Sequence, residues 1–203
     1  METTMSAAKK LALLSVDDYL AGERVSPIKH EYLGGVVYAM SGARVQHDVI
    51  AGNIFAQLHA NLRNRRCRPH TSDMKIRVRL PTQIRFYYPD VSVVCKSNPP
   101  TDSFQDEPVV IFEILSRSTR RIDEGEKKDA YLMIPSLLVY ALVDQEQPRI
   151  VVFRRSEQGF VREVYEGPDS EISLPEIDTS LRLADVYTGV EFVAEVEDDE
   201  DAR

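Results

Sequence analysis

The chain has 203 residues, of which 43% are hydrophobic and 29% charged, a composition typical of one globular domain with its own core. No stretch approaches the roughly 20 apolar residues that cross a bilayer, and the N-terminus lacks a secretory signal pattern, so we expect a soluble, cytoplasmic protein with no membrane partner. Residues 191–203 carry seven acids and one base, a local net charge of −6, which leaves −2 of the total −8 for the rest. Net charge therefore does not exclude a nucleic-acid partner.

We expect one domain over residues 1–190, followed by an acidic tail over 191–203 that is disordered because its like charges repel. The two cysteines, Cys67 and Cys95, are too few for a disulfide framework and lack zinc-finger spacing, so we expect both to be reduced and without function. Eight basic residues lie close together in sequence and could form a local phosphate-facing surface. They are Arg63, Arg65, Arg66, Arg68, Lys75, Arg77, Arg79 and Arg85.

The first half of the chain mixes helical and strand patterns. Ser15 can cap a helix that ends near Gly22, since two aspartates follow in its first turn, where the helix dipole favours them. The pair Gly34-Gly35 predicts a turn. Apolar spacing predicts the other elements. These are a short helical turn over 28–33, a strand over 36–40, an amphipathic helix over 44–64 and a half-buried strand over 74–80.

The second half is richer in strand patterns. One strand is predicted over 84–95 with Pro89 near its start or at a bulge, and a central one over 109–115, where apolar residues occupy both faces. Ser118 or Thr119 can cap a helix that runs to about Met133. Further strands are predicted over 138–143, 150–154 and 160–165. The order of elements predicts an α/β fold with a mixed central sheet flanked by helices and extra antiparallel strands.

Glu113 is the most informative single residue, because it stands in the apolar run Val-Val-Ile-Phe-Glu-Ile-Leu. An ionised carboxylate buried without a partner costs several kcal/mol or more, so a metal ion or a buried cation must compensate. Strand alternation puts Glu113 on one face with Ile111 and Leu115, and that face must open to a cleft. A structural ion pair is the alternative explanation.

Asp90 enters the next apolar run directly after Pro89. Pro-Asp before a strand is often turn chemistry alone. If the strands of Asp90 and Glu113 are adjacent, however, their carboxylates can converge on one hard cation such as Mg²⁺ or Mn²⁺, leaving other positions to water and a substrate phosphate. Such a metal would activate a water and neutralise the charge that builds on the phosphate.

A family resemblance rests on several motifs together. Pro-Asp, a loop and an apolar strand with Glu resemble the signature of the PD-(D/E)XK nuclease superfamily. The runs Glu113-Ile-Leu-Ser-Arg-Ser-Thr, Asp123-Glu-Gly-Glu-Lys-Lys-Asp-Ala-Tyr and Tyr140-Ala-Leu-Val-Asp are similar to those of the Uma-two family of restriction endonucleases. Upstream, Glu31-Tyr-Leu-Gly-Gly and Ser41-Gly-Ala extend the resemblance over most of the chain. It implies a restriction-endonuclease-like core.

The resemblance also implies roles for individual residues. Asp90 and Glu113 would be metal ligands, with the backbone carbonyl of Ile114 as a third. The superfamily places a lysine two positions after the Glu, where this chain has Leu115, and the family pattern assigns that catalytic role to Lys127 on the following helix. The superfamily often contributes an acid from its first helix, and the family pattern includes a histidine near the start of the next helix. The supporting catalytic candidates are therefore Glu31 and His47.

We therefore expect a Mg²⁺- or Mn²⁺-dependent endonuclease that hydrolyses phosphodiester bonds, with double-stranded DNA as the expected partner. A homodimer would let two sites cut both strands of a duplex. The missing lysine at Leu115 leaves open a nucleic-acid-binding or assembly module that keeps the nuclease fold but has lost its activity. A third possibility is a glycosidase that uses Asp90 and Glu113 as an acid and base without a metal.

Overall fold

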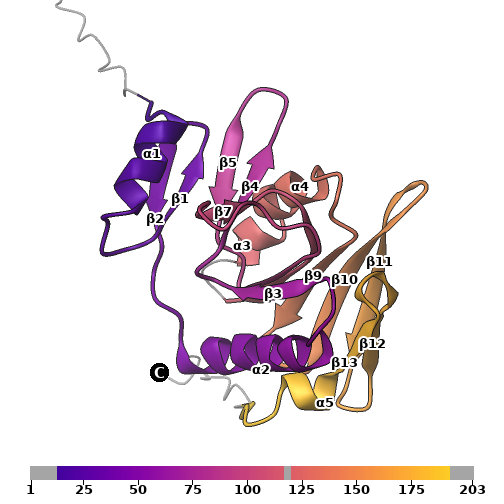
Figure 1. Cartoon of the computed structure of the whole chain (residues 1–203). Coiled ribbons are helices and arrows are strands. Elements are labelled where there is room, and N and C mark those ends of the chain that lie inside the picture. The colour runs from indigo at the N-terminus through magenta and orange to yellow at the C-terminus, as the bar shows by residue number, and fades with distance from the viewer. Residues whose placement is uncertain (1–12, 117–119, 193–203) are drawn as a thin grey trace, which may run out of the picture.

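The computed structural model describes residues 13–116 and 120–192, which form two main sheets, a small hairpin and the helices that cover them (Figure 1). The elements in chain order are α1 (Val16–Glu23), β1 (His30–Leu33), β2 (Val36–Ala39), α2 (Val45–Asn61), β3 (Arg68–Thr71), β4 (Lys75–Arg79), β5 (Ile84–Tyr87), β6 (Val91–Val94), β7 (Phe104–Gln105), β8 (Pro108–Leu115), α3 (Arg120–Asp123), α4 (Glu126–Leu132), β9 (Val139–Asp144), β10 (Arg149–Ser156), β11 (Gly159–Glu166), β12 (Glu171–Leu174), a 3₁₀ turn (Pro175–Ile177), β13 (Thr179–Arg182) and α5 (Leu183–Val186).

The larger sheet has the strand order β11-β10-β9-β8-β6-β3. Its neighbours are antiparallel except for β8 and β9, which are parallel and joined by α3 and α4. The sheet is therefore mixed, and β8 lies in its interior, as predicted. The predicted hairpin arms are also confirmed, since β9 pairs with β10 and β10 with β11, both in antiparallel orientation.

Both faces of the larger sheet are covered, which explains why β8 is apolar in both directions. Ile50, Ile54 and Leu58 of α2 pack on one face, against residues that include Phe112. On the other face, Ile111 packs with Tyr131 of α4 and with residues of β4 and β5. Figure 1 shows α2 on one side of β3 and β9, with α3 and α4 on the other. Each fully buried large apolar side chain contributes about 1.5–3 kcal/mol to folding.

The segment predicted as a helical turn over 28–33 is a strand, and that prediction was wrong. β1 pairs with β2 through the two-residue turn Gly34-Gly35, whose positive φ angles of 59° and 108° suit a tight hairpin. On its other edge β1 pairs with β5, and Tyr32 packs against Phe86. These contacts join segments far apart in the sequence, which local propensity does not register. Glu31 therefore lies on a strand and not on a helix.

The single strand predicted over 84–95 is two strands in different sheets. β5 pairs with β4 and β1 in the five-stranded sheet, whose order is β2-β1-β5-β4-β7, whereas β6 pairs with β3 and β8. Pro89 lies between them, where the missing N–H and fixed φ favour a break. The consequence is that Asp90 stands at the start of β6, beside β8.

The two cysteines form a disulfide, so the prediction that they are reduced was wrong. Antiparallel pairing of β3 with β6 sets Arg68 opposite Val94, which brings the flanking residues Cys67 and Cys95 to opposite positions with their Cα atoms 3.9 Å apart. Their separation of 28 residues gives no hint of this, because the pairing depends on the course of the chain between them.

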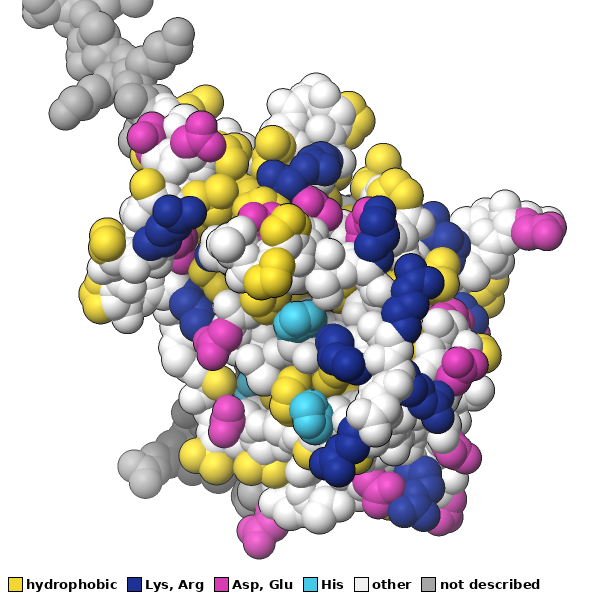
Figure 2. Space-filling view, in the orientation of Figure 1, with side chains coloured by type: hydrophobic (Ala, Val, Ile, Leu, Met, Phe, Trp, Pro, Cys, Tyr) yellow, Lys and Arg dark blue, Asp and Glu magenta, His cyan; other side chains and the backbone are white. Residues whose placement is uncertain are grey.

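Three of the eight basic residues between 63 and 85 are ion-paired or buried within the fold, and a phosphate-facing surface formed by the others stays a prediction. Arg77 pairs with Asp106 at 2.7 Å, Arg85 pairs with Glu126 at 2.8 Å, and Lys75 is buried. Figure 2 shows Lys and Arg side chains dispersed over one face of the molecule, with Asp and Glu between them. The alternation over 75–79 reflects a half-buried strand, and the exposed arginines of the set lie mainly before it, at 63, 65, 66 and 68.

The remaining predictions fall into three groups. The helices that begin after Ser15 and near Arg44 are confirmed as α1 and α2, and Ser15 caps α1 by accepting the N–H of Asp18 at 3.1 Å. The helix predicted up to Met133 is divided into α3 and α4 at Gly125. The predicted caps at 118 and 119 and the tail beyond 192 lie outside the described residues. Among the helices of the described ranges, none is long and apolar enough to span a membrane.

Candidate functional site

Asp90 and Glu113 lie together because β6 and β8 are neighbours. The antiparallel register pairs Val91 with Phe112, so the preceding residue Asp90 lies opposite Glu113. Asp90 Oδ2 accepts the backbone N–H of Ile114 at 2.7 Å, which fixes this carboxylate against the strand that carries Glu113. The adjacency on which the predicted site depends is therefore present in the fold.

Lys127 reaches the buried carboxylate of Glu113 from α4. Its Nζ lies 3.0 Å from Glu113 Oε1 and 3.2 Å from Glu31 Oε1. Glu113 is 2% exposed and Lys127 7%, so this contact is shielded from bulk water. The five residues predicted as catalytic thus include three that meet at one ammonium group, although they come from β1, β8 and α4.

Asp123 is a fourth acid at this point, and sequence analysis gave it no role. Its carboxylate lies 3.6 Å from Nζ of Lys127, four residues further along the chain. An acid four residues before a lysine is a common helical ion pair, and this spacing was the signal available. The break at Gly125 hides it, because the two residues belong to the separate helices α3 and α4.

The site holds more negative than positive charge. Four carboxylates, those of Glu31, Asp90, Glu113 and Asp123, surround the single ammonium of Lys127. Burial raises the pKa of Glu113 well above its usual range, and the ammonium only partly opposes this effect. Burial by itself lowers the pKa of Lys127, but Glu113 and Glu31 outweigh burial and raise it well above its usual range. The lysine therefore stays charged while one carboxyl tends to hold a proton.

His47, on α2, lies against the carboxylate of Asp90. Its Nε2 is 3.3 Å from Asp90 Oδ2, and its side chain is largely buried. Burial lowers the pKa of His47, but the hydrogen bond and charge of Asp90, with a contact to the backbone of Ile114, outweigh burial and raise it. His47 therefore lies where it can hold Asp90 in place.

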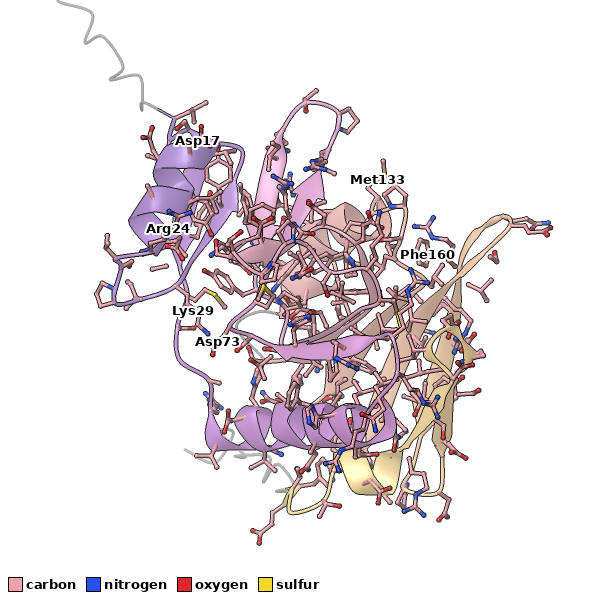
Figure 3. The ribbon with its side chains drawn as sticks, viewed as in Figure 1. Asp17, Arg24, Lys29, Asp73, Met133 and Phe160 are labelled. Carbon is pink, nitrogen blue, oxygen red and sulfur yellow. A yellow bond between two sulfur atoms is a disulfide. The ribbon has the colours of Figure 1, made fainter. Side chains whose placement is uncertain are left out.

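A hollow of about 570 Å³ opens onto these residues. Asp90, Glu113, Lys127, Glu31 and His47 all line it. At its rim, Lys29 bridges Asp73 and the carbonyl of Ser72, as Figure 3 shows for the facing side chains of Lys29 and Asp73. The cleft that strand alternation required for Glu113 is therefore present, and it brings together every residue predicted for the site.

Leu115 occupies the position where the superfamily has a lysine, and it is packed in the core with Ile111 and Leu142. A lysine there would place its charge in that apolar cluster, whereas Lys127 reaches Glu113 from the helix above. Lys128, the next residue, points elsewhere, with its Nζ 5.2 Å from the ring centre of Phe153. Lys127 thus supplies the positive charge from a different element.

Asp90, Glu113 and the Ile114 carbonyl offer oxygen donors, the kind of atom that hard divalent cations take as ligands. Glu113 Oε1 is buried and makes no well-formed hydrogen bond within the described ranges, although the Lys127 ammonium is near. An extended residue points its N–H and C=O to the same side, so the Ile114 carbonyl faces the Asp90 side as its N–H does. No group of three or more His, Cys, Asp or Glu suited to a metal occurs in the described parts of the chain. Two carboxylates and one carbonyl therefore form the available oxygen set.

A mixed sheet, with one carboxylate after a proline and a second on the adjacent apolar strand, defines the restriction-endonuclease-like class of folds. A solved structure described as a putative nuclease belonging to DUF820 from Anabaena variabilis has a similar fold, with a TM-score of 0.67, 17% identity, and coverage of 86% of this chain and 98% of that one. At that identity the likeness shows the fold alone.

The family is shown by the sequence comparisons. The Uma2 family model, described as "Putative restriction endonuclease", matches residues 16–184, and the chain belongs to this family. The Synechocystis protein slr1290 is 32% identical over 181 residues, which cover 88% of this chain and 94% of that protein. The Synechocystis protein sll1609 is 30% identical over 136 residues, covering 66% and 76%. Both relatives carry the description "uncharacterized protein".

Proposed function

We propose that this protein is a metal-dependent endonuclease that hydrolyses phosphodiester bonds in double-stranded DNA. The observation that carries the proposal is the excess of acid in the hollow, which five carboxylates and three cationic side chains line and in which the pKa of buried Glu113 is raised. Idle charges of this kind are costly in a protein interior. Membership of a restriction-endonuclease family supports phosphodiester hydrolysis as the activity that retains them.

Asp90, Glu113 and the Ile114 carbonyl would hold Mg²⁺ or Mn²⁺. When bound, the ion supplies positive charge to the scissile phosphate and makes water a better nucleophile. Asp90 is held for this role by the Ile114 N–H and by His47. These contacts keep the carboxylate in one orientation before substrate arrives, which lowers the cost of organising the site.

Lys127 would act on the phosphate or on the attacking water through its ammonium group. Glu31 and Asp123 keep this group protonated and directed at Glu113. A charged donor on a flexible stem can stabilise the extra negative charge of a pentavalent phosphate from a helix as well as from a strand. In this proposal Lys127 takes the role of the superfamily lysine, whose position is occupied by Leu115 in this chain.

Leu115 also supports a second candidate, a nucleic-acid-binding module without cleavage. The superfamily lysine is missing from its usual position, and the proposed replacement is engaged by three carboxylates. If those contacts hold Lys127 away from substrate, the fold binds nucleic acid and does not cut it. Cleavage measurements on Lys127 variants distinguish the two candidates.

The test is a cleavage assay on supercoiled plasmid together with calorimetric titration of Mg²⁺ and Mn²⁺. Wild type should bind metal, and Mg²⁺ at about 100 times the Kd found by calorimetry should raise the melting temperature by several degrees. Asp90→Asn with Glu113→Gln should abolish both effects and cleavage, whereas Glu163→Gln, a change of similar kind elsewhere, should retain them. Equal metal binding by wild type and the double variant would overturn the site assignment.

We further propose a homodimer in the cytoplasm. Two sites related by a two-fold axis suit the cutting of both strands of a duplex, and sedimentation with bound DNA would detect two chains per duplex. The location has a chemical test, because disulfides are rare in the reducing cytosol. The Cys67–Cys95 disulfide of the structure therefore counts against this location, and trapping thiols in intact cells tests it: a disulfide that persists there would exclude the cytoplasm.

A further inference from the structure

A second hollow lies on the face of the larger sheet that carries Glu113. The strand register pairs Glu113 with Leu142 on β9, and Leu142 with Val151 on β10. Neighbouring strands are about 4.8 Å apart, so Leu142 and Val151 continue the same row at roughly 5 and 10 Å from Glu113. Both residues line a hollow of about 420 Å³. Its floor is therefore an extension of the row on which Glu113 lies.

Positive side chains predominate around this second hollow. Its cations are Arg120, Lys128, Arg149 and Arg162, and its carboxylates are Glu124 and Asp144. The excess of positive charge contrasts with the net charge of −8 for the whole chain and with the acidic hollow beside it. A ligand that occupies this hollow and reaches Glu113 is therefore expected to carry negative charge along its length.

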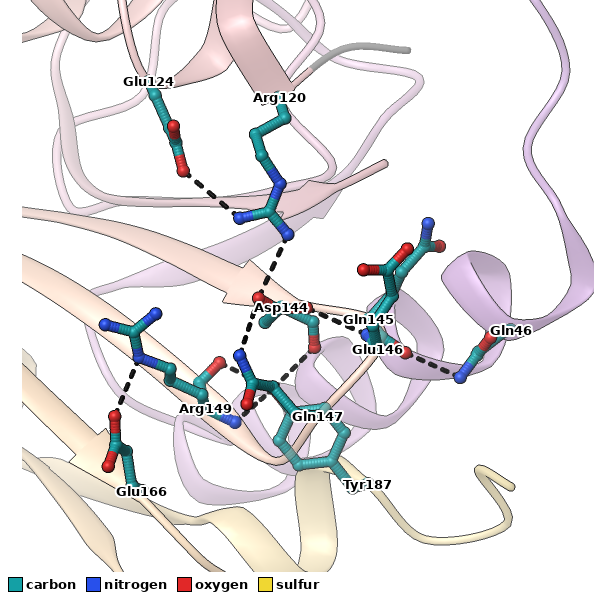
Figure 4. Close-up of polar contacts among 10 residues, drawn as sticks. All are labelled: Gln46, Arg120, Glu124, Asp144, Gln145, Glu146, Gln147, Arg149, Glu166 and Tyr187. Atoms are coloured by element: carbon teal, nitrogen blue, oxygen red, sulfur yellow. Dashed lines mark hydrogen bonds and ion pairs between the residues drawn. The ribbon is translucent and has the colours of Figure 1, made fainter. Parts of the chain in front are cut away.

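Two of the four cations are used within the fold. Arg120 bridges Glu124 at 3.3 Å and Asp144 at 3.1 Å, and Arg149 pairs with Glu166 at 2.9 Å (Figure 4). These contacts fix the walls of the hollow, because they tie α3 to the end of β9 and β10 to β11. Their charges are already compensated by protein carboxylates.

The other two cations, Lys128 and Arg162, have no carboxylate within ion-pair distance among the described residues. Lys128 Nζ lies over the ring of Phe153, and the register pairs Phe153 with Arg162 on β11. The two unpaired cations therefore border the same aromatic ring. The N–H groups of Lys128 and Arg162 are therefore available to donate to a ligand beside Phe153.

The helix α4 connects the two hollows. Lys127 directs its ammonium to Glu113, while Lys128, about 100° further around the helix, directs its own toward Phe153. Consecutive lysines thus serve adjacent hollows on one sheet face. The row between the hollows is covered, since Leu142 is 3% exposed and belongs to the buried cluster that includes Tyr131 of α4, so a polyanion that reaches both hollows crosses the outside of this helix.

We propose that the hollow beside Lys128 and Arg162 is a phosphate subsite, which binds the DNA backbone next to the scissile phosphate. The inference rests on the proposed function and extends it to a named part of the substrate. A lysine supplies a compact charge and an arginine a forked donor, and both are common partners of phosphate oxygens. Backbone contacts of this kind set the position of the duplex without reading its bases.

The test measures binding of a fluorescein-labelled DNA duplex of about 20 base pairs, a length near two helical turns, by anisotropy in EDTA. Lys128→Gln with Arg162→Gln should weaken binding about tenfold at ~0.1 M salt and reduce the slope of log affinity against log salt by almost 2, since each lost phosphate contact removes about 0.9. The control is Arg24→Gln with Arg63→Gln, which removes the same charge from exposed positions outside both hollows.

The control double variant should change binding and salt slope much less. Equal losses in the two double variants would overturn the subsite, because a general loss of charge would explain both. In single-turnover cleavage at saturating enzyme, the Lys128/Arg162 variant should keep a rate within about twofold of wild type, with only the half-saturating concentration raised. A loss of cleavage at saturation would place these residues in the chemistry and overturn the subsite.

The outcomes also separate this inference from the proposed function. If wild type neither binds nor cleaves duplex DNA, both fall. If wild type binds and cleaves while the Lys128/Arg162 variant matches the control variant, only the subsite falls. If the variant binds weakly but cleaves normally at saturation, both are supported.

Discussion

Two ion clusters in this molecule have similar components and opposite character. Near the surface, Arg154 donates to Glu163 at 2.9 and 3.2 Å and also to Glu176. In the hollow, Lys127 lies among Glu113, Glu31 and Asp123. Hydrogen bonds from Arg154 lower the pKa of Glu163, whereas burial raises the pKa of Glu113 well above its usual range. Arg154 donates to both acids of the first cluster, whereas Glu113 Oε1 in the second accepts no well-formed hydrogen bond among the described residues.

The difference teaches that an ion pair alone does not distinguish a structural site from a functional one. Both clusters place a cation between carboxylates within 4 Å, but only one combines near-complete burial with an excess of acid. Structural ion pairs gain by matching charges. A site that binds a metal cation has to keep carboxylates that no protein cation neutralises, and these unneutralised carboxylates lower the stability of the folded protein.

The largest expected contrast concerns cleavage by Lys127→Met and Arg154→Met, which remove one cation from each cluster. Loss of the Lys127 ammonium should reduce the single-turnover rate about a thousandfold, the effect typical of removing a donor to a transition-state oxyanion. Arg154→Met should leave the rate within about twofold. Equal, measurable rates for Lys127→Met and wild type would remove Lys127 from the chemistry, and an absence of cleavage by wild type would favour the binding module.

A second contrast concerns stability against pH. The folded pKa of Glu113 is raised, so its stabilising contribution is full below the unfolded pKa of about 4.3 and is lost as pH rises through the folded value. The folded pKa of Glu163 is lowered, so its contribution is present above about 4.3 and is lost as pH falls. The two carboxyls thus give stability slopes of opposite sign.

Denaturant unfolding of Glu113→Gln and Glu163→Gln tests these slopes. At pH 7 and without metal, Glu113→Gln should be more stable than wild type by on the order of 1–2 kcal/mol, and the difference should vanish near pH 4. Glu163→Gln should be less stable at pH 7 by about 0.5 kcal/mol, a small value because the pair is partly exposed. If Glu113→Gln were destabilising at pH 7, the acid of the hollow would be as well satisfied as that of the surface cluster.

The smallest expected effect concerns His47, which has no counterpart in the surface cluster. His47→Asn keeps a donor near Asp90 but shortens its reach, so metal affinity should fall a few-fold while the melting temperature stays within about 2 °C of wild type. Titration calorimetry at pH 7 measures the first quantity and thermal unfolding the second. An unchanged affinity would remove His47 from the positioning of Asp90.

Sequence reasoning captured the parts of the fold that local patterns specify. The long apolar run of β8 and the spacing of α2 identified the core, and Glu113 was identified because a charge within an apolar strand demands compensation. The predictions that were wrong concern contacts between residues far apart in the sequence. The strand β1, the division at Pro89 and the contact of Cys67 with Cys95 all follow from partners many residues away. Asp123 was missed because a break in the helix hides its spacing to Lys127.

The hydrogen bond from the Ile114 N–H to Asp90 makes one backbone amide an internal reporter for the site. Its proton resonance is displaced by the carboxylate that accepts it, so any event that draws charge from Asp90 shifts that single NMR signal. Ile114 is buried, with 1% of its surface exposed, which slows exchange of the amide proton with solvent and keeps the signal observable. An NMR spectrum of protein labelled with ¹⁵N only at isoleucine would therefore report when the hollow is occupied. It would also show whether occupancy comes before or after DNA binding, without any cleavage taking place.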